Sequence, residues 1–365
     1  MTTSPSRKTW GVLLFLAAAV LLYIGASLAR FAFTPAKPGS QETSIIEVHR
    51  GDSPAEITRM LQQKGAISDT RLFSWLGRMT RSWRKIKSGE YEVSGAMTPL
   101  ELLGTLSSGV SINHPLTVRE GENMYEIADS LEEKGLGTKE RFLALSRSPK
   151  FIASLGFKVP LPQTLEGYLY PETYFINRSM SVEDIIRQMV KRFIAVWAAF
   201  DGQEKTLGLT RHEVVTLASI VEKETGAPEE RPLISSVFHN RLKKRMRLQS
   251  DPTTIYGMWE RYTGKIHKSD LLAPSPWNTY TVSALPIGPI SNPGREALTA
   301  ALNPATSDLL FFVSKNDGTH EFNKTFEAHD AAVTRLQKDP KAREGKSWRD
   351  LKNRTPPTPQ APSNG

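Results

Sequence analysis

The longest apolar run in the chain lies near its start, between Lys8 and Arg30, and contains no charged residue. It has about 20 residues, enough for a helix to cross the hydrocarbon core of a membrane. Arg7 and Lys8 precede it and no acidic residue does, so the positive-inside rule predicts a cytoplasmic N-terminus and an extracytoplasmic remainder. The alternative is a cleaved signal peptide, with Ser27 and Ala29 as small cleavage-site residues. The run is longer than a usual signal core, which favours a membrane anchor.

Beyond this run, one pattern of apolar, charged and glycine positions occurs twice. Val48–Gly65 and Val118–Gly135 align without a gap, and each predicts a strand, a turn and a helix that ends at glycine. Ser53 and Glu56 form a capping box at the first of these helices, and Gly89–Ser94 is typical of a strand. The first copy therefore predicts a βααβ module, whose order of elements resembles LysM domains. It is either a spacer or a module that binds glycan.

The remaining two thirds of the chain mix helix and strand patterns without regular alternation. Residues 184–200 have the apolar spacing of a helix, and Asn292-Pro293 predicts the start of another that ends near Leu302. Asp308–Phe322 predicts a hairpin with its turn at Asn316-Asp317-Gly318. These patterns predict an α+β fold, with the transmembrane helix and the LysM-like module placed before a mixed α+β domain.

Aromatic residues gather in Leu161–Phe175, where they alternate with carboxylates. Exposed rings beside hydrogen-bond acceptors suit the faces and hydroxyls of sugars, which makes Glu166 and Tyr174 candidate substrate-binding residues. The alternative is a tyrosine-rich strand pair that packs on the core.

The amino-acid composition excludes several kinds of site and partner. The chain has no cysteine, so disulfides, thiol nucleophiles and Cys-containing metal sites are excluded. Its formal net charge of +9 would suit an anionic partner, yet the basic residues are scattered and no nucleic-acid motif accompanies them. We therefore expect no nucleic-acid partner.

Two glutamates lie two positions apart in the predicted helix Arg211–Thr225, which starts at a capping box and stops before Gly226. Glu224 continues the apolar stripe of this helix, whereas Glu222 lies about 200° round the helix from it. An apolar environment raises the pKa of a carboxyl, as a general acid requires. Glu224 is therefore the candidate for chemistry, and Glu222 is expected to be solvated or salt-bridged.

An arginine partner for Glu224 is the alternative to a catalytic role, and three arginines are candidates for it: Arg231, Arg241 and Arg247.

Polar residues in two later segments are candidates for holding sugars or orienting Glu224. They are Asn240, Gln249 and Asp251 in the first segment, and Asn278 and Tyr280 in the second. For Asp251, which precedes Pro252, the simpler interpretation is a helix N-cap.

Four motifs follow one another along the chain: ASIVEKET, FHNRLKKRMRLQSDPTTIYG, NTYTVSALPIGPISNPG and HEFNKTFEAH. In order and spacing they resemble the membrane-anchored endolytic peptidoglycan transglycosylases of the YceG-like (MltG) family. The resemblance covers the chain from Ser44 to about Gln337. It implies that the second glutamate of the E-K-E-T segment, Glu224, is catalytic, in agreement with its place on the helix.

The resemblance also implies a reaction and its setting. The enzyme would cleave the β-1,4 bond between N-acetylmuramic acid and N-acetylglucosamine within nascent glycan strands, leave 1,6-anhydro ends, and so terminate elongation. It implies no metal and no organic cofactor. Peptidoglycan strands would be the substrate, and peptidoglycan synthases (penicillin-binding proteins) are candidate partners. The site would be periplasmic, on a protein anchored once in the inner membrane.

Two other functions remain open. A muramidase-type hydrolase would use Asp251 or Glu222 as a second carboxylate, and a non-catalytic glycan-binding scaffold would not need Glu224. The expected organisation is a cytoplasmic N-terminus (1–9), a transmembrane helix (10–29), a linker (30–43), the LysM-like module (44–112), the catalytic domain (113–338) and a disordered tail (339–365).

Overall fold

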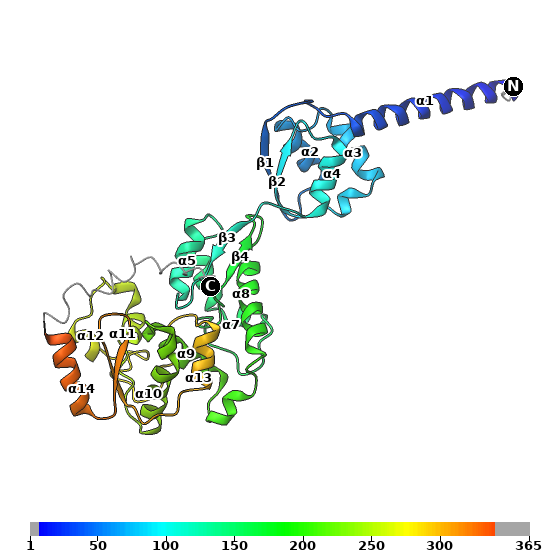
Figure 1. The fold of residues 1–365 in the computed structure, drawn as a ribbon. Helices are drawn as coiled ribbons and strands as arrows, with labels where there is room; N and C mark the ends of the chain where they lie inside the picture. The colour runs from blue at the N-terminus through cyan, green and yellow to red at the C-terminus, as the bar shows by residue number, and fades with distance from the viewer. Residues whose placement is uncertain (1–6, 340–365) are drawn as a thin grey trace, which may run out of the picture. The chain divides into compact units, whose positions relative to one another are not determined.

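The computed structural model describes residues 7–339, and these divide into two compact units (Figure 1). The described residues up to Leu116, together with Phe175–Ser181, form the first unit. Thr117–Tyr174 and the residues from Val182 onward form the second. The expected tail falls outside the described residues except for Asp339.

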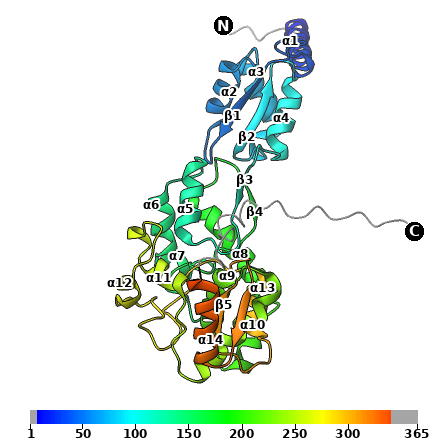
Figure 2. The same cartoon turned by 60° about the vertical axis from the view of Figure 1, so that its left-hand side comes forward.

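The first unit joins a long helix to a small α/β module. Its elements in order are α1 (Arg7–Phe33), β1 (Thr43–Val48), α2 (Pro54–Gln63), α3 (Thr70–Met79), the 3-10 turn Ser82–Arg84, β2 (Gly89–Ser94) and α4 (Pro99–Ser108). β1 and β2 pair antiparallel, with Ile46 opposite Tyr91 (Figure 2). The predicted order βααβ is confirmed. Within α1, Leu14–Phe33 is long and apolar enough to span a membrane.

Glycines end the two repeat helices as the pattern predicts. Gly65 follows α2 with φ +69°, and Gly135 follows α5 (Met124–Glu133) with φ +66°. Both φ values lie in the left-handed region that residues with a Cβ rarely adopt. The capping box of Ser53 and Glu56 at α2 is also present, so the sequence places this helix correctly at both ends.

The second unit is mostly helical. Beyond α5 its helices are α6 (Lys139–Ser146), α7 (Pro149–Ala153), α8 (Val182–Trp197), α9 (Arg211–Glu224), α10 (Arg231–Lys243), α11 (Asp251–Gly257), α12 (Lys268–Leu272), α13 (Arg295–Leu302) and α14 (Phe326–Val333). Shorter turns are Gln203–Leu207, Pro228–Glu230, Trp259–Arg261 and Thr334–Lys338. Within this unit β5 (Phe311–Ser314) pairs with β6 (His320–Asn323). β3 (His114–Thr117) pairs with β4 (Thr173–Ile176), and the boundary between the two units falls within both strands. The hairpin predicted in Asp308–Phe322 is confirmed as β5–β6.

Helix α9 lies at the centre of this unit and packs against α10, α11 and α13 (Figure 1). Every residue from Val214 to Val221 is buried. A helix that is buried on all sides must carry small or apolar residues all round, and this one does. Its burial fixes the position of its C-terminal residue, Glu224.

Two details differ from the sequence prediction. α13 begins at Arg295 with Gly294 as N-cap, not at Asn292-Pro293. Asn292 is fully buried, and its side chain accepts from the Leu169 N–H and donates to the Glu122 carbonyl. Because these tertiary partners use the asparagine amide, it does not cap the helix.

The tyrosines of 161–175 are the second difference. Tyr168, Tyr170 and Tyr174 are 1%, 8% and 6% exposed, so they do not present open rings to a sugar. The alternative of core packing is confirmed, although only Thr173–Ile176 of this segment forms a strand.

Candidate active site

Glu224 is the last residue of α9, and it lies where the predicted apolar stripe places it. Leu217, Ile220 and Val221 on that stripe are each fully buried, while Glu224 itself is partly buried. Thr225 leaves the helix with an extended backbone. The helix therefore holds the Glu224 carboxyl at the edge of the packed interior.

Ser250 is the hydrogen-bond partner of Glu224. Its hydroxyl donates to Oε1 over 2.6 Å, and the residue is only 1% exposed. The Ser250 N–H in turn donates to the Thr279 hydroxyl over 2.9 Å, and the Thr253 hydroxyl donates to the Ser250 carbonyl. These bonds hold the serine in one orientation. Within residues 7–339, Oε2 has no such partner.

The start of α11 corrects the prediction for Asp251. Ser250 has the extended N-cap backbone, and Asp251 is the first helical residue. Ser250 makes no side-chain cap, because its hydroxyl is used by Glu224. The Ser250 side chain therefore hydrogen-bonds to Glu224 on α9 instead of capping α11.

Burial raises the pKa of Glu224 to about 7, and the nearby charge of Asp251 acts in the same direction. The Ser250 hydrogen bond and the charge of Arg241 act against this rise. The C-terminal end of a helix is also its negative end, so it disfavours an anion there. A carboxyl with a pKa near 7 can both give and take a proton at neutral pH.

None of the three suggested arginines forms an ion pair with Glu224 among the residues that the structure describes. Arg241 is 7% exposed and donates from Nε to the Leu310 carbonyl and from Nη1 to the Leu248 carbonyl. Arg231 pairs with Glu222. Arg241 thus binds backbone carbonyls and Arg231 binds Glu222, and neither forms an ion pair with Glu224.

Glu222 has the structural role expected of it. Its Oε1 lies 3.2 Å from Arg231 Nη2, and its Oε2 accepts from the Gly294 N–H over 3.0 Å. Its side chain is 6% exposed. The two glutamates therefore do not share an environment, as the helix faces predict, and Glu222 joins α9 to the starts of α10 and α13.

Asp251 and Tyr280 lie near enough to the Glu224 carboxyl to interact with it electrostatically. The Tyr280 hydroxyl donates to Asp251 Oδ1 over 2.6 Å, and Asp251 is exposed. Gln249 is exposed and has φ +51°, a left-handed conformation that is uncommon for a residue with a long side chain. The structure brings Asp251 and Tyr280 together near Glu224, and Gln249 lies in the loop directly before Ser250.

Asn278 and Asn240 support loops instead. Asn278 is 1% exposed, donates to three backbone carbonyls of 270–273, and accepts from the Thr254 hydroxyl and the Tyr280 N–H. Asn240 donates to the carbonyls of Ser307 and Leu309. Their amides bind the protein's own backbone.

Glu166 and Tyr174 also have internal partners. Glu166 is 1% exposed and accepts from the Met124 N–H at the start of α5 and from the Asn292 amide. Burial raises its pKa to about 7. The Tyr174 hydroxyl donates to the Tyr170 carbonyl. These residues tie loops to helix ends, and the geometry does not favour contact with a substrate.

Sequence reasoning missed Ser250 and its support, Thr279 and Thr253. The signal was a serine directly before Asp-Pro, where it can cap a helix, but only the fold shows that this hydroxyl meets Glu224. Within residues 7–339, no group of three or more His, Asp or Glu side chains is placed to hold a metal ion.

Comparisons with known proteins match most of the chain. A family model described as the YceG-like family matches residues 46–335. A Bacillus subtilis protein named endolytic murein transglycosylase is 31% identical over 311 residues, covering 82% of this chain and 86% of the relative. A Streptococcus pneumoniae protein of the same name is 29% identical over 344 residues, covering 85% of this chain and 61% of the relative.

A solved structure agrees with this match. The crystal structure of a YceG-like protein from Listeria monocytogenes is 34% identical, with a TM-score of 0.55. The match covers 80% of this chain and 100% of the Listeria chain. The resemblance drawn from the four motifs is thereby confirmed.

Proposed function

The chain belongs to the YceG-like family, and on this basis we propose that it is an endolytic murein transglycosylase, which cuts the glycan strands of peptidoglycan at internal bonds. Relatives with that name cover 82% and 85% of the chain. The observation that carries the proposal is the Glu224 carboxyl, with a pKa of about 7 and Oε1 held by Ser250.

In the first step, protonated Glu224 acts as the general acid. Ser250 holds Oε1, so Oε2 carries the proton toward the substrate. The proton passes to the O4 atom of N-acetylglucosamine as its bond to C1 of N-acetylmuramic acid breaks. Asp251 lies near enough to raise the pKa of Glu224, and its negative charge also stabilises the positive charge that develops at C1.

In the second step, the Glu224 carboxylate acts as the base. It takes the proton from the C6 hydroxyl of the muramoyl residue as that oxygen bonds to C1 and closes the 1,6-anhydro ring. The carboxyl returns to its protonated state, so atoms and protons balance without an added water. One titrating carboxyl therefore suffices for both steps.

Isotope labelling of the cut strands tests this route. Digestion in water enriched in oxygen-18 should give anhydro ends that contain no new oxygen-18. A product heavier by one labelled water, with a reducing end, would show a hydrolase instead. That is the second candidate function, and the proximity of Asp251 to Glu224 is the observation that favours it.

The long apolar helix supports a membrane anchor. The apolar stretch Leu14–Phe33 has a mean hydropathy of 2.0. In our proposal residues 10–29 of α1 span the inner membrane, with the N-terminus in the cytoplasm and the catalytic unit outside. Such a protein should stay in the membrane fraction with its apolar segment intact. Recovery of a mature N-terminus at Arg30 would identify a removed signal peptide.

The first unit supports the proposal that the LysM-like module binds glycan. A groove of about 160 Å³ lies between the turn after β1 and the segment before β2. His49, Asp52, Trp83 and Lys87 line it, together with backbone of the turn. An indole ring beside polar groups suits a sugar. A module that holds a strand near the membrane would work beside peptidoglycan synthases, the partners we propose.

A further inference from the structure

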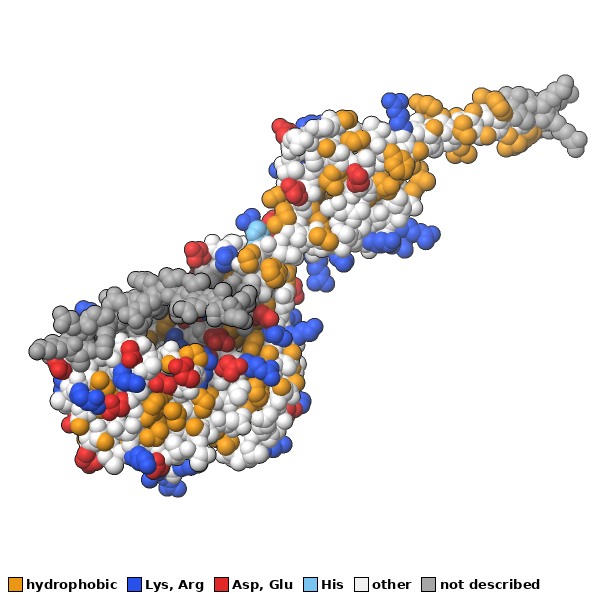
Figure 3. Space-filling view, in the orientation of Figure 1, with side chains coloured by type: hydrophobic (Ala, Val, Ile, Leu, Met, Phe, Trp, Pro, Cys, Tyr) orange, Lys and Arg blue, Asp and Glu red, His pale blue; other side chains and the backbone are white. Residues whose placement is uncertain are grey.

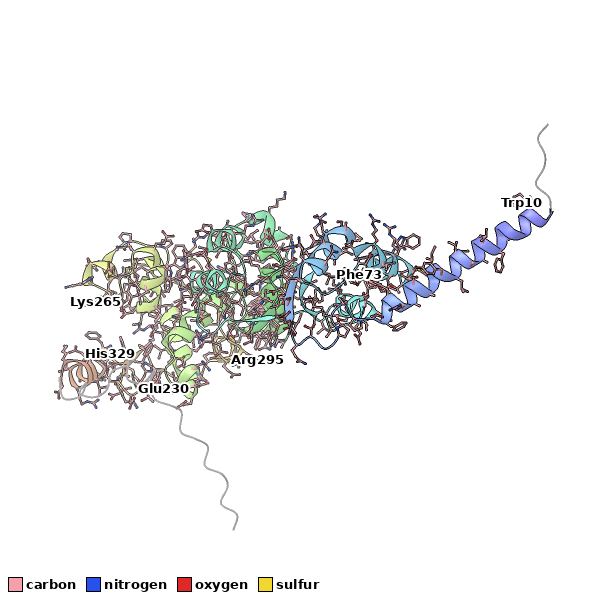
Figure 4. All side chains as sticks on the ribbon, turned by 90° about the horizontal axis from the view of Figure 1, so that it is seen from above. Trp10, Phe73, Glu230, Lys265, Arg295 and His329 are labelled. Atoms are coloured by element: carbon pink, nitrogen blue, oxygen red, sulfur yellow. The ribbon has the colours of Figure 1, made fainter. Side chains whose placement is uncertain are left out.

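One face of α3 combines exposed apolar and basic side chains. Trp75 and Met79 are 58% and 66% exposed. Arg71 and Arg78 lie on the same face, because residues three or four apart are neighbours on a helix. Phe73, on the opposite side, is fully buried in the module (Figure 4). A helix face that only meets water usually carries polar residues, so tryptophan and methionine at this position suggest a partner.

A groove of about 450 Å³ follows this face between α2 and α3. Three arginines line it, Arg59 from α2 and Arg71 and Arg78 from α3, with Trp75 between them. Guanidinium groups bind phosphate in a planar, two-pronged geometry. The groove is therefore suited to an anionic group that has an apolar surface next to it.

The charge of this segment is one-sided. Residues 59–87 contain eight Lys or Arg and one acidic residue, Asp69. Asp69 caps α3 by accepting from the N–H groups of Arg71 and Leu72. Across residues 7–339, the salt bridges involve none of these eight basic side chains. Their charges are available to an outside partner.

The end of α1 brings this face close to the proposed membrane. Leu28, Phe31 and Ala32, in the last turns of α1, belong to the core of the module. α3 packs directly against α1, which places it roughly 8–10 Å from the helix axis. Because the proposed membrane segment is the preceding part of the same helix, the module starts at the membrane surface, where headgroup charges act over roughly 8 Å at physiological salt. Figure 3 shows apolar side chains at the foot of α1 and basic side chains on the same side of the module.

We propose that the face of α3 formed by Arg71, Trp75, Arg78 and Met79, together with Arg59 of α2, docks on anionic phospholipid headgroups of the membrane that holds α1. The inference rests on the proposed membrane anchor. Tryptophan prefers the membrane interface, and arginine extends from apolar surface to phosphate. Docking fixes the rotation of the module about the axis of α1, which the anchor alone leaves free.

The lack of cysteine in the chain allows a direct test with single labels. The full-length protein carries Ser74→Cys, in the groove, with an environment-sensitive fluorophore, and is inserted into vesicles. The matched control is Glu92→Cys, an exposed residue on β2 opposite Ile45, on the sheet face away from the buried Tyr91. Vesicles contain phosphatidylcholine alone or with 30% phosphatidylglycerol, and a lipid nitroxide near the headgroup serves as quencher.

We expect the label at residue 74 to be quenched by the lipid nitroxide and shielded from aqueous iodide in the anionic vesicles, and the label at residue 92 to show the reverse. Raising the salt to 1 M should weaken the quenching at residue 74. Arg71→Gln with Arg78→Gln should lower the ratio of docked to undocked module by about fivefold for each arginine.

Two results would overturn the docking proposal, and a third measurement separates it from the proposed membrane anchor. Equal iodide access at residues 74 and 92, with or without phosphatidylglycerol, overturns the inference. Shielding that appears only after purified peptidoglycan is added also overturns it, because the groove would then bind a wall polymer. Flotation of the vesicles separates the two proposals. A protein that does not float with them lacks the anchor, whereas a floating protein with an exposed label refutes the docking alone.

Discussion

At the residue scale, two glutamates in one helix take different roles because of what lies around each. Glu222 has an arginine and a backbone N–H as partners, whereas Glu224 has one serine hydroxyl. A buried carboxyl with few hydrogen bonds or opposite charges to stabilise its ionised form has a raised pKa, and a general acid needs that property. This difference in partners is why we propose Glu224, and not Glu222, as the reacting group.

Ser250→Ala removes the hydrogen bond to Oε1 of Glu224. This bond lowers the pKa of the carboxyl, so its loss should raise the pKa further and move the alkaline limit of the pH–rate profile to higher pH. The rate at the optimum should fall about tenfold, because Glu224 is less firmly oriented. A profile that keeps its alkaline limit would contradict this role of the serine.

Glu166→Gln tests a second buried carboxyl. Its folded pKa of about 7 exceeds the ordinary value of 4.5, so on raising the pH the unfolded chain loses its proton first. The free energy of unfolding should therefore fall between about pH 4.5 and 7, by roughly 3 kcal/mol for this group.

The Glu166→Gln variant should lose that part of the pH dependence and be relatively more stable at pH 8. Urea unfolding across this range measures it. The exposed carboxyl of Glu133 on α5 gives the control, Glu133→Gln, which should keep the parental slope. An unchanged slope in Glu166→Gln would show that the buried group is ionised throughout.

The sequence was enough to single out Glu224, because the helix period alone places it on the apolar stripe with Leu217 and Val221. It was not enough to exclude Asn278 or Asn240 as sugar contacts. Whether an amide points to a ligand or to a backbone carbonyl depends on residues distant in the chain, and periodicity does not report these.

At the element scale, capping boxes and glycines predicted where helices begin and end. Two helices, α11 and α13, begin at other residues than predicted, because tertiary contacts use the side chains concerned. A capping box needs only two residues three positions apart, and that of α9 is present as predicted. Asn292 was wrongly taken as a helix start, because its amide meets Glu122 and Leu169. Asp251 was taken as the N-cap of α11, but it is the first helical residue and Ser250 occupies the N-cap position.

The end of α9 makes a testable contact with the β5–β6 hairpin. A Cβ on Gly226 would lie 2.4 Å from the Gly318 carbonyl oxygen, and His320 ties the hairpin to Glu230. Gly226→Ala should therefore destabilise this region by roughly 1–3 kcal/mol. Gly104 in α4 has open space around it, so Gly104→Ala should stabilise its helix by about 1 kcal/mol.

Hydrogen exchange of the α9 and α4 amides measures both changes. We expect the protection of amides to fall in α9 of Gly226→Ala and to rise in α4 of Gly104→Ala, although both variants replace glycine with alanine. Equal protection of α9 in Gly226→Ala and the parent would mean that the hairpin can move away without cost.

At the scale of the whole molecule, we propose that the two units divide the work, with glycan binding in the first and the chemistry in the second. Every group placed around Glu224 belongs to the second unit, including α9, α11 and the loop of Tyr280. A fragment of residues 113–338 keeps β3 for pairing with β4, so it should fold and cut soluble glycan strands. Complete loss of activity in a fragment with native circular dichroism would contradict this division of labour.

The central claim is that Glu224 gives and then takes the proton, and Glu224→Gln tests it most directly. The amide keeps the size of the side chain and loses the titrating proton. The measurement is the rate of anhydro-end formation from purified glycan strands, with Glu222→Gln as the control on the same helix. Glu224→Gln should lower the rate by about 10²–10⁴-fold with its fold intact. Glu222→Gln, which mainly weakens the pairing with Arg231, should keep most of it per folded molecule. Near-parental cleavage by a folded Glu224→Gln protein would contradict the account.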